Sequence, residues 1–414
     1  MSGKTVLISG GGIAGPAVAY WLQRFGFVPT VVERAAAPRP GGHAVDLRGA
    51  SPGVVERMGL LDEVRGRSLH ERGMAFVDAD GRHRAEIPVE AFGGRGGVAE
   101  IEILRGDLAE VLVDATGDGV EYRYGDHITA LDQDADGVRA RFASAVEERY
   151  DLVIGADGAH SRVRALAFGP EERFAHPLGA CTAHYTIPAE RAVADGLDLG
   201  EWFSVHSAPG RRMVATRPDR DGGIKAMFMI GSSGADDALL RDPVAQRALL
   251  RERFADVGWQ ARAMLAAMDG ADDFYFDSYA QVRMPTWSNG RVVLLGDAAY
   301  CPSPITGQGT NLALVGAYVL AGELALAGDD VAAGAAAYER ALREYVQRNH
   351  KLPPGGLSAM LPGSRFAIRM GYAFNRLMTS RFVEPLATRL MLGDDDGFTP
   401  RDYPADLASP TRCA

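Results

Sequence analysis

Cysteine is scarce in this chain, which holds three cysteines, Cys181, Cys301 and Cys413, among 414 residues. Their odd number and wide spacing exclude a disulfide framework and a cysteine-based zinc site, and they suit a reducing compartment. No other metal-ligand motif is present in the sequence. We therefore expect no metal centre and a cytoplasmic location.

Long apolar runs are missing as well. The first apolar stretch, residues 5–8, is too short for the core of a signal peptide and runs directly into glycines. No window holds the roughly 18 apolar residues of a membrane span. These absences predict a protein with no membrane partner.

Concentrated positive charge is the third missing feature. The formal net charge is −10, and the 44 basic residues form no basic stripe. A nucleic-acid partner is excluded, because binding to a phosphate backbone requires clustered basic side chains. The length of 414 residues exceeds the usual limit of one hydrophobic core and predicts two packed domains.

A glycine-rich turn near the start is the first positive signal. Residues 5–9 form a β-branched run, as expected for a strand buried on both faces of a parallel sheet. Gly10, Gly12 and Gly15 follow in the pattern G-x-G-x-x-G. A helical pattern comes next, and a second strand is expected at residues 29–33.

This pattern predicts a dinucleotide site. The first glycine allows the tight turn, the second lets a pyrophosphate approach the backbone, and the third lets the helix pack on the strand. Unpaired N–H groups at the helix N-terminus attract the phosphates. Glu33 ends the second strand about 20 residues on, where a carboxylate accepts hydrogen bonds from ribose hydroxyls. The alternative is a structural β-α-β turn followed by a surface glutamate.

Two later strands resemble the first one. Residues 150–154 and 291–295 are mostly apolar and each leads into a Gly/Asp turn, so three distant parts of the chain should share one parallel sheet. The region 173–282 instead alternates polar and apolar residues between turn clusters, which predicts an inserted antiparallel sheet. From Gly309 on, the sequence predicts helices at 311–326 and 331–348.

Four motifs place the dinucleotide site in a family. Residues 157–164 match D-G-x-x-S-x-x-R, residues 296–304 are similar to G-D-A-A-H-x-x-P, residues 307–311 read G-Q-G-x-N, and residues 105–108 look like R-x-x-L. The first three, which follow one another along the chain in this order, resemble the single-component flavoprotein monooxygenases typified by para-hydroxybenzoate hydroxylase, near the tetracycline-inactivating and polyketide hydroxylase branch, and residues 105–108 add to that resemblance. Tyr300 stands where that family commonly has histidine.

The resemblance implies an α/β fold with a three-layer, Rossmann-like FAD-binding domain around a parallel sheet. That domain would be discontinuous, formed by residues 1–172 and 283–350. Residues 173–282 would form the antiparallel substrate domain. Residues 351–414 would form a C-terminal segment, helical at 357–392, with an irregular tail.

The resemblance also assigns residues to FAD. Asp297 would accept from a ribityl hydroxyl, with helix capping as its alternative role. The N–H groups of Thr310 and Asn311 would reach flavin O2 at a helix N-terminus and stabilise negative charge. The turn at Asp157 would support the pyrophosphate side and nicotinamide docking. The cofactor-binding set is Gly10, Gly12, Ile13, Ala14, Gly15, Glu33, Arg34, Arg105, Asp157, Asp297, Pro304, Gly307, Gly309, Thr310 and Asn311.

Catalytic residues are harder to assign. Arg48 ends a loop that, by resemblance, passes beside the isoalloxazine, although a surface arginine fits the sequence equally well. His184, Met213 and Phe228 lie on alternating strands of the expected substrate domain and are candidates to line the pocket. An ordinary sheet-face role is the alternative for each of them.

The implied reaction uses NADPH or NADH as a transient co-substrate to reduce bound FAD. A C4a-hydroperoxyflavin then transfers one oxygen atom of O2 to an electron-rich aromatic or polyketide-like small molecule. Two alternatives remain open: an FAD-dependent reductase or oxidase on the same scaffold, and a non-catalytic flavoprotein that binds a pathway intermediate. A monomer and a homodimer both fit the sequence.

Overall fold

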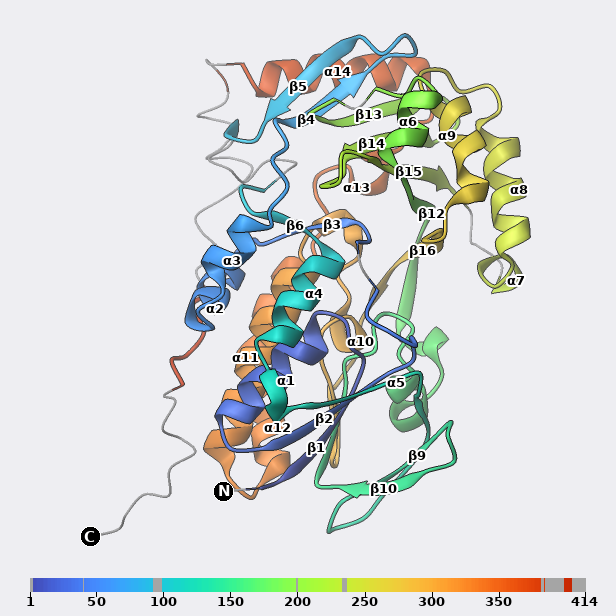
Figure 1. Ribbon diagram of the computed structural model, residues 1–414. Helices are drawn as coiled ribbons and strands as arrows, with labels where there is room; N and C mark the ends of the chain where they lie inside the picture. The colour runs from blue at the N-terminus through green and yellow to red at the C-terminus, as the bar shows by residue number, and fades with distance from the viewer. Residues whose placement is uncertain are drawn as a thin grey trace.

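A parallel sheet lies in the lower half of the molecule (Figure 1). The computed structural model describes residues 3–39, 41–91, 99–198, 200–232, 237–380, 383 and 398–403. All strand pairs of this sheet are parallel except β17–β18. In spatial order its strands are β17 (Ser288–Asn289), β18 (Val292–Leu294), β11 (Leu152–Gly155), β1 (Thr5–Ser9), β2 (Val28–Glu33) and β7 (Glu121–Tyr124).

The predicted assembly of this sheet from distant parts of the chain is confirmed, since β1, β11 and β18 lie side by side. Val6, Leu7 and Ile8 are fully buried, which explains why β1 is apolar on both faces. Helices cover one face, and a three-stranded antiparallel sheet lies on the other side (Figure 1). The helices are α1 (Ala14–Arg24), α2 (Ser51–Arg57), α3 (Leu61–Gly66), α4 (Arg105–Asp114), α11 (Gly309–Ala327) and α12 (Val331–Asn349), and the small sheet contains β8 (Ile128–Gln133), β9 (Val138–Phe142) and β10 (Glu147–Tyr150).

Helix α11 deserves comparison with a membrane span, because its 19 residues are apolar enough to cross a bilayer by length and composition. However, 83% of its most apolar window is buried inside the protein. It packs against α1 and α12. This helix is therefore the central core helix of the lower body.

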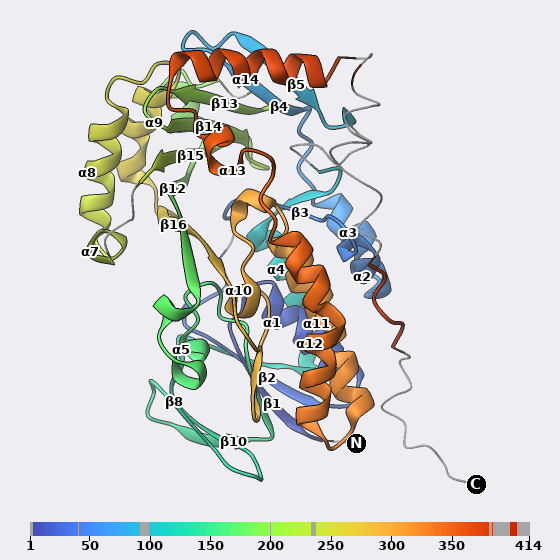
Figure 2. The same ribbon diagram turned by 180° about the vertical axis from the view of Figure 1, so that it is seen from behind.

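A seven-stranded sheet forms the upper half (Figure 2). Five of its strands come from the region 173–282, as predicted. However, β4 and β5 come from residues 73–88, where no sequence signal separates them from the first domain. Strand β4 joins by pairing in parallel with β13. In spatial order the strands are β16 (Tyr275–Val282), β12 (Ala175–Ile187), β15 (Ile224–Gly231), β14 (Arg212–Pro218), β13 (Phe203–Ala208), β4 (Gly73–Val77) and β5 (His83–Pro88).

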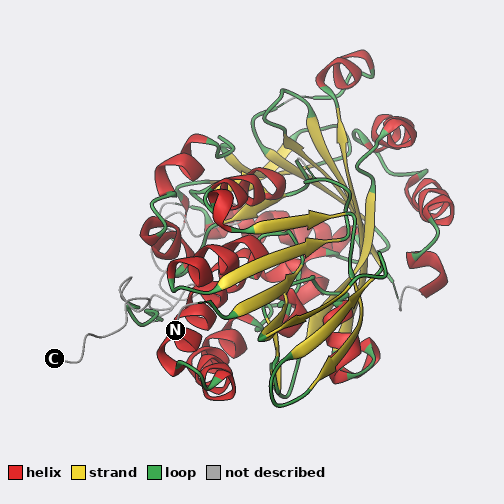
Figure 3. Cartoon of the chain, turned by 60° about the horizontal axis from the view of Figure 1, so that its bottom comes forward, coloured by secondary structure: helices red, strands yellow, loops and turns green. Residues whose placement is uncertain are grey.

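The two faces of the upper sheet pack against different partners. Alternate residues such as Tyr185 and Phe228 share a buried cluster with Phe254 and Met264 of the helices on the outer face. The opposite residues, such as Met213, cluster with the loop that leads to α11. Helices therefore lie on either side of the strands (Figure 3). The outer helices are α6 (Ala189–Ala194), α7 (Asp237–Leu240), α8 (Pro243–Phe254) and α9 (Ala261–Ala267).

The remaining elements connect the two bodies or follow them. Strands β3 (Ala44–Asp46) and β6 (Glu102–Leu104) form a two-stranded sheet between the halves. The predicted C-terminal helical segment begins with two helices, and the rest of residues 381–397 lies outside the described residues except for residue 383. The other helices are α5 (Arg162–Phe168), α10 (Asp297–Tyr300), α13 (Gly356–Met360) and α14 (Arg365–Met378).

Candidate active site

The glycine turn after β1 is packed too tightly for side chains. Gly10 has φ +111°, and a Cβ atom there would lie 2.4 Å from the carbonyl oxygen of Ala156. A Cβ atom on Gly15 would lie 1.9 Å from the carbonyl oxygen of Gly10. The first and third glycines of the motif are thus required by the fold itself.

Gly12 differs from its two neighbours in the motif. A Cβ atom at Gly12 would meet only the Nη2 atom of Arg105, at 3.0 Å. Burial is the largest cause that lowers the pKa of Arg105, and the nearby cation Arg39 lowers it further. Helix α1 begins directly after Ile13 without a side-chain cap on its first N–H groups. This combination of free N–H groups and a guanidinium provides an anion site.

Glu33 lies at the end of β2, beside the glycine turn. Its carboxylate accepts hydrogen bonds from the N–H groups of Gly11, at 2.7 Å, and Ala35, at 2.8 Å. A carboxylate accepts about four hydrogen bonds, so capacity remains for ribose hydroxyls. The neighbouring Arg34 is solvent-exposed.

The turn at Asp157 is organised internally. The Asp157 carboxylate accepts from the hydroxyl of Ser161 and from the N–H groups of Arg162, at 2.8 Å, and Val163, at 3.1 Å. These bonds start α5 and hold the Ala156 carbonyl against the glycine turn. Asp157 therefore fixes the backbone that faces the glycine turn.

The loop before α11 brings together the other predicted cofactor residues. Pro304 begins a short 3-10 turn that ends at Gly307, which has φ +64°. A Cβ atom at Gly307 would lie 3.7 Å from Nε of Arg48. Helix α11 starts at Gly309 with no side-chain cap. Arg48, predicted from resemblance alone, thus lies directly beside this loop.

Polar atoms at this end of α11 lack partners among the described residues. The buried Oγ of Ser303 and Oδ1 of Asn311 have no hydrogen bond. The Asn311 amide nitrogen donates to the hydroxyl of Tyr345 at 2.7 Å, and that hydroxyl also accepts from the N–H of Ala50 at 3.4 Å. Tyr345 therefore joins the start of α11 to the Arg48 loop.

Asp297, for which the sequence predicted a ribityl contact, follows β18 as the first residue of α10. Burial, the largest cause, raises the pKa of its carboxyl, while Cys301 and Arg105 act in the opposite direction. A Cβ atom at Gly309 would lie 3.8 Å from its Oδ1 atom. Helix α10 has no side-chain cap, so the alternative role of Asp297 as a helix cap is not observed.

These features fit FAD along its whole length. Uncapped N–H groups and Arg105 would hold the pyrophosphate, and Glu33 the ribose. Asp297 would bind the ribityl chain, while the start of α11, with the two unpartnered polar atoms, would receive the ring system. The cradle leaves space at Gly12 and Gly307 where a larger residue would project into it.

Comparison with known proteins agrees with this site. Residues 4–352 match the family model described as an FAD binding domain. A flavin-dependent monooxygenase of Legionella longbeachae is 40% identical over 348 residues, which cover 84% of this chain and 87% of the relative. The chain belongs to the FAD-dependent monooxygenases.

More distant members of this family extend the match. The FAD-dependent monooxygenase asL6 of Sarocladium schorii is 33% identical over 96% of this chain and 98% of its own length. The crystal structure of tetracycline destructase Tet(51) superposes with a TM-score of 0.79, at 33% identity, covering 98% of this chain and all of that one. The expected branch of the family and the α/β fold are confirmed.

Histidines from the Arg48 loop and from the substrate sheet of the monooxygenase lie next to each other. Desolvation is the largest cause that lowers the pKa of His43, to about 3. The neighbouring ring of His184 and three cations, Arg105, Arg217 and Lys225, lower it further.

His184 is the neighbour of His43 on β12. Its ring centroid lies 5.7 Å from that of His43, and its Nε2 atom lies 3.0 Å from the hydroxyl of Thr182. Burial lowers its pKa to about 4. Lys225 reaches the loop of His43, because its Nζ lies 3.1 Å from the place of a Cβ atom on Gly41.

The other two predicted substrate residues lie on opposite faces of the sheet. Met213 is buried in the cluster that includes Ile305 of the loop before α11, so it faces the cofactor side. Phe228 stacks on Tyr185 and packs edge-on against Phe254, on the outer face. The pocket role expected for Phe228 is therefore wrong, because successive strand residues alternate and Met229 takes the inner face.

The substitution of Tyr300 for the family histidine affects packing. Its hydroxyl lies 2.9 Å from that of Tyr338, and its ring is 4.6 Å from Trp287. A Cβ atom on Gly316 would lie 2.2 Å from this hydroxyl, so α11 passes it closely. Tyr300 points into the core of the lower body.

A buried charge cluster, missed by sequence reasoning, lies near the two histidines. Arg217 donates two hydrogen bonds of 2.9 Å to Glu71 and a further one to Glu102. Both carboxylates are buried, and Oε2 of Glu102 has no partner among the described residues. The Asp46 carboxylate accepts a hydrogen bond of 2.8 Å from Nε of Arg48. Asp46 and Glu102 are opposite residues in the paired strands β3 and β6. The cluster thus connects the substrate sheet to the Arg48 loop.

Glu102 should make the stability of the protein pH-dependent. The pKa of this carboxyl is raised from an ordinary value of 4.5 to about 8, and burial is the largest cause of the shift. Between these values the folded state holds a proton that the unfolded chain releases. The free energy of unfolding should therefore fall as pH rises through this window, by up to about 1.4 kcal/mol per pH unit.

Urea unfolding at pH 5, 6, 7 and 8, at one fixed FAD concentration, measures this slope. Glu102→Gln should flatten it, whereas Glu252→Gln, an exposed carboxylate on α8, should keep the wild-type slope. An unchanged slope in Glu102→Gln would show that other groups cause the pH dependence.

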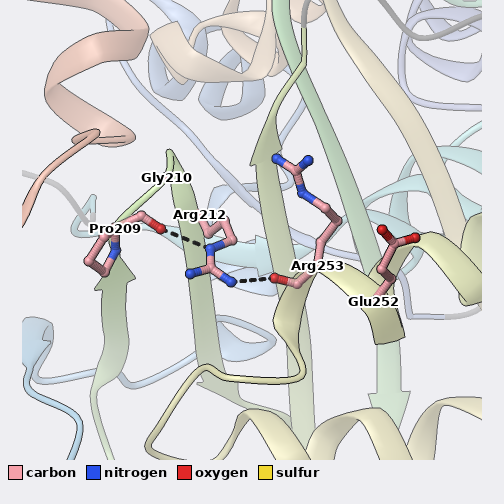
Figure 4. A pocket seen from close by; sticks show the side chains of 5 residues that line it. All are labelled: Pro209, Gly210, Arg212, Glu252 and Arg253. Carbon is pink, nitrogen blue, oxygen red and sulfur yellow. Dashed lines mark hydrogen bonds between the residues drawn. The ribbon is translucent and has the colours of Figure 1, made fainter.

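A cavity of about 250 Å³ lies at the outer edge of the substrate sheet (Figure 4). It is lined by Pro209, Gly210, Arg212, Glu252 and Arg253. The Arg212 guanidinium donates to the carbonyls of Pro209 and Arg253 and pairs with Asp256. These bonds fasten α8 to the β13–β14 hairpin, remote from the cofactor residues.

Proposed function

We propose that this monooxygenase uses NAD(P)H and O2 to hydroxylate an electron-rich aromatic or polyketide-like small molecule. The observation that carries the proposal is the meeting of His43, in the predicted flavin loop, with His184 of the substrate sheet, at a distance of 5.7 Å between ring centroids. The likeness to tetracycline destructase Tet(51) supports a polycyclic substrate of this kind.

Bound FAD supplies the two-electron redox chemistry that activates O2. The chain supplies position and electrostatics. Because the pKa values of His43 and His184 are about 3 and 4, both rings are neutral at pH 7 and accept hydrogen bonds from substrate hydroxyls. The charged neighbours of His43 are cationic, which favours a phenol in its ionised, more electron-rich form.

The buried free thiols of Cys181 and Cys301 support the proposed cytoplasmic location, where cysteines stay reduced. Burial raises the pKa of both thiols, so neither is poised for nucleophilic chemistry.

The deciding experiment incubates the FAD-loaded protein with NADPH or NADH under ¹⁸O2, with tetracycline and a panel of polycyclic phenols. We expect at least one substrate to stimulate NAD(P)H oxidation and to gain one ¹⁸O atom by mass spectrometry. His184→Ala should raise KM about tenfold through the loss of a hydrogen bond, whereas His176→Ala, exposed on the same strand, should not. Hydrogen peroxide formed in place of a labelled product, with every phenol, would refute the proposed substrate class.

A further inference from the structure

Helix α14 exposes an unusual amount of apolar surface. Four of its side chains are exposed: Phe366 at 74%, Met370 at 53%, Phe374 at 50% and Leu377 at 56%. Every other described helix exposes at most one large apolar residue. A soluble surface helix normally turns such residues toward the core, so this face needs an explanation.

The four residues form one continuous face. Their spacing of four, four and three residues places them on one side of an α-helix. The opposite side anchors the helix to the protein: Ile368 is buried, and the Tyr372 hydroxyl donates to the carbonyl of Val77 at 3.0 Å. Figures 1 and 2 show α14 lying across the outer end of the substrate sheet beside β5, far from the parallel sheet.

A row of arginines borders this apolar face. Arg365, Arg369 and Arg376 are spaced by four and seven residues, so they follow the same flank of the helix. None of them forms an ion pair with a described residue. Residues 365–378 contain no acidic residue, although the whole chain carries a formal charge of −10. Positive charge is therefore concentrated at the apolar face.

We propose that the apolar face of α14 docks on the surface of an anionic lipid bilayer. A helix with an apolar face and arginines along its border lies in the membrane interface, with its side chains in the acyl boundary and its cations at acidic headgroups. A second copy of the chain fits less well, because its α14 would bring three more arginines and no acidic partner. This attachment is peripheral and departs from the expectation of no membrane partner.

Docking through α14 has a consequence for the substrate sheet. Because α14 packs on β5 and β13, a bilayer at its apolar face would lie directly over the substrate half of the molecule. The parallel sheet would then be at the far end (Figure 2). An apolar substrate dissolved in the bilayer would then pass from the membrane directly to the substrate half of the enzyme.

Flotation of the full-length, FAD-loaded protein with phospholipid vesicles tests the proposal. One set contains phosphatidylcholine with phosphatidylglycerol, and the other contains phosphatidylcholine alone. We expect binding at least about tenfold stronger on the anionic vesicles, weakened by 0.5 M salt. The double variant Phe366→Ser/Phe374→Ser and the triple variant Arg365→Gln/Arg369→Gln/Arg376→Gln should each lose at least about tenfold in binding.

The matched control is Val244→Ser, which removes an apolar residue that is 77% exposed on α8 and should bind as the wild type does. Equal FAD content and visible spectra confirm that the variants are folded. Absence of binding, equal binding to both vesicle types, or wild-type binding by the α14 variants would overturn the proposal. Self-association in sedimentation velocity that the Phe366→Ser/Phe374→Ser variant abolishes would instead assign the face to a second copy.

Discussion

Replacing Arg217 by methionine should lower the free energy of unfolding by about 3–5 kcal/mol, because the change leaves two buried carboxylates without their shared cation. The side chains of Glu71 and Glu102 are 0% and 3% exposed, and Arg217 is their partner in the cluster. The guanidinium also lies 4.4 Å above the ring of Phe203, a contact that methionine retains only in part.

Urea denaturation at pH 8, near the raised pKa of Glu102, measures this effect where more of that carboxyl is ionised than at lower pH. Arg123→Met is the matched control, since Arg123 also bridges two carboxylates, Glu121 and Glu148, but at the surface. Surface pairs contribute about 0–1 kcal/mol. Equal losses in the two variants would contradict the prediction.

A rescue variant separates lost charge from lost packing. Arg217→Met combined with Glu71→Gln and Glu102→Gln removes the unpaired charges and leaves the side-chain volumes nearly unchanged. It should recover much of the lost stability, because uncompensated buried charge is the main cost of breaking such a cluster. Failure to recover would assign the loss to packing against Phe203.

The parallel sheet and its glycine turn could be predicted from the sequence because local signals determine them. Strand β1 covers the predicted residues 5–9, and α11 and α12 begin and end within two residues of their predicted bounds. A strand buried on both faces is apolar throughout, and a turn with no room for a Cβ atom requires glycine. Each of these constraints acts on neighbouring residues, so it is visible in one segment.

The meeting of the His43 loop with the substrate sheet could not be predicted in the same way, because long-range pairing creates it. Nothing in residues 73–88 indicates that β4 and β5 join the substrate sheet, since β4 is added by pairing with β13. Glu71 and Glu102 meet Arg217 only after that sheet has formed. The one available signal was a charged residue, Arg217, on a face of β14 shared with Met213.

Phe228 shows the same limit in a single residue. The alternation in β15 was visible, but the sequence does not tell which of the two faces is covered by α8 and α9. A choice of the wrong face moves every side chain from one side to the other. The substrate face is defined by the packing of Met213 and Met229 near Ile305, a contact between distant segments.

The glycine motif allows folding and cofactor binding to be tested separately, because its positions differ in what a side chain would meet. Gly15→Ala should prevent correct folding: its Cβ atom would lie 1.9 Å from a backbone oxygen, closer than real Cβ atoms approach. We expect destabilisation at or beyond the upper end of the about 1–3 kcal/mol typical of overpacking. Thermal unfolding of the apoprotein measures this loss.

Gly12→Ala should leave folding intact and weaken FAD binding. Its Cβ atom meets only the flexible end of Arg105, so the apoprotein should unfold at the temperature of the control Gly66→Ala, where nothing lies within 4 Å. The added methyl would occupy the space through which a pyrophosphate approaches the backbone. An overlap of about 1–3 kcal/mol corresponds to a Kd for FAD raised about 5- to 150-fold.

Quenching of flavin fluorescence gives this Kd without reference to turnover. Unchanged FAD affinity in Gly12→Ala would mean that the pyrophosphate does not pass this glycine, and the cofactor assignment of Arg105 would fail with it. Lost affinity together with a destabilised apoprotein would instead show that Arg105 cannot move aside. Only a raised Kd for FAD, together with an unchanged unfolding temperature of the apoprotein, fits a site in which Gly10 and Gly15 are required for folding and Gly12 for the cofactor.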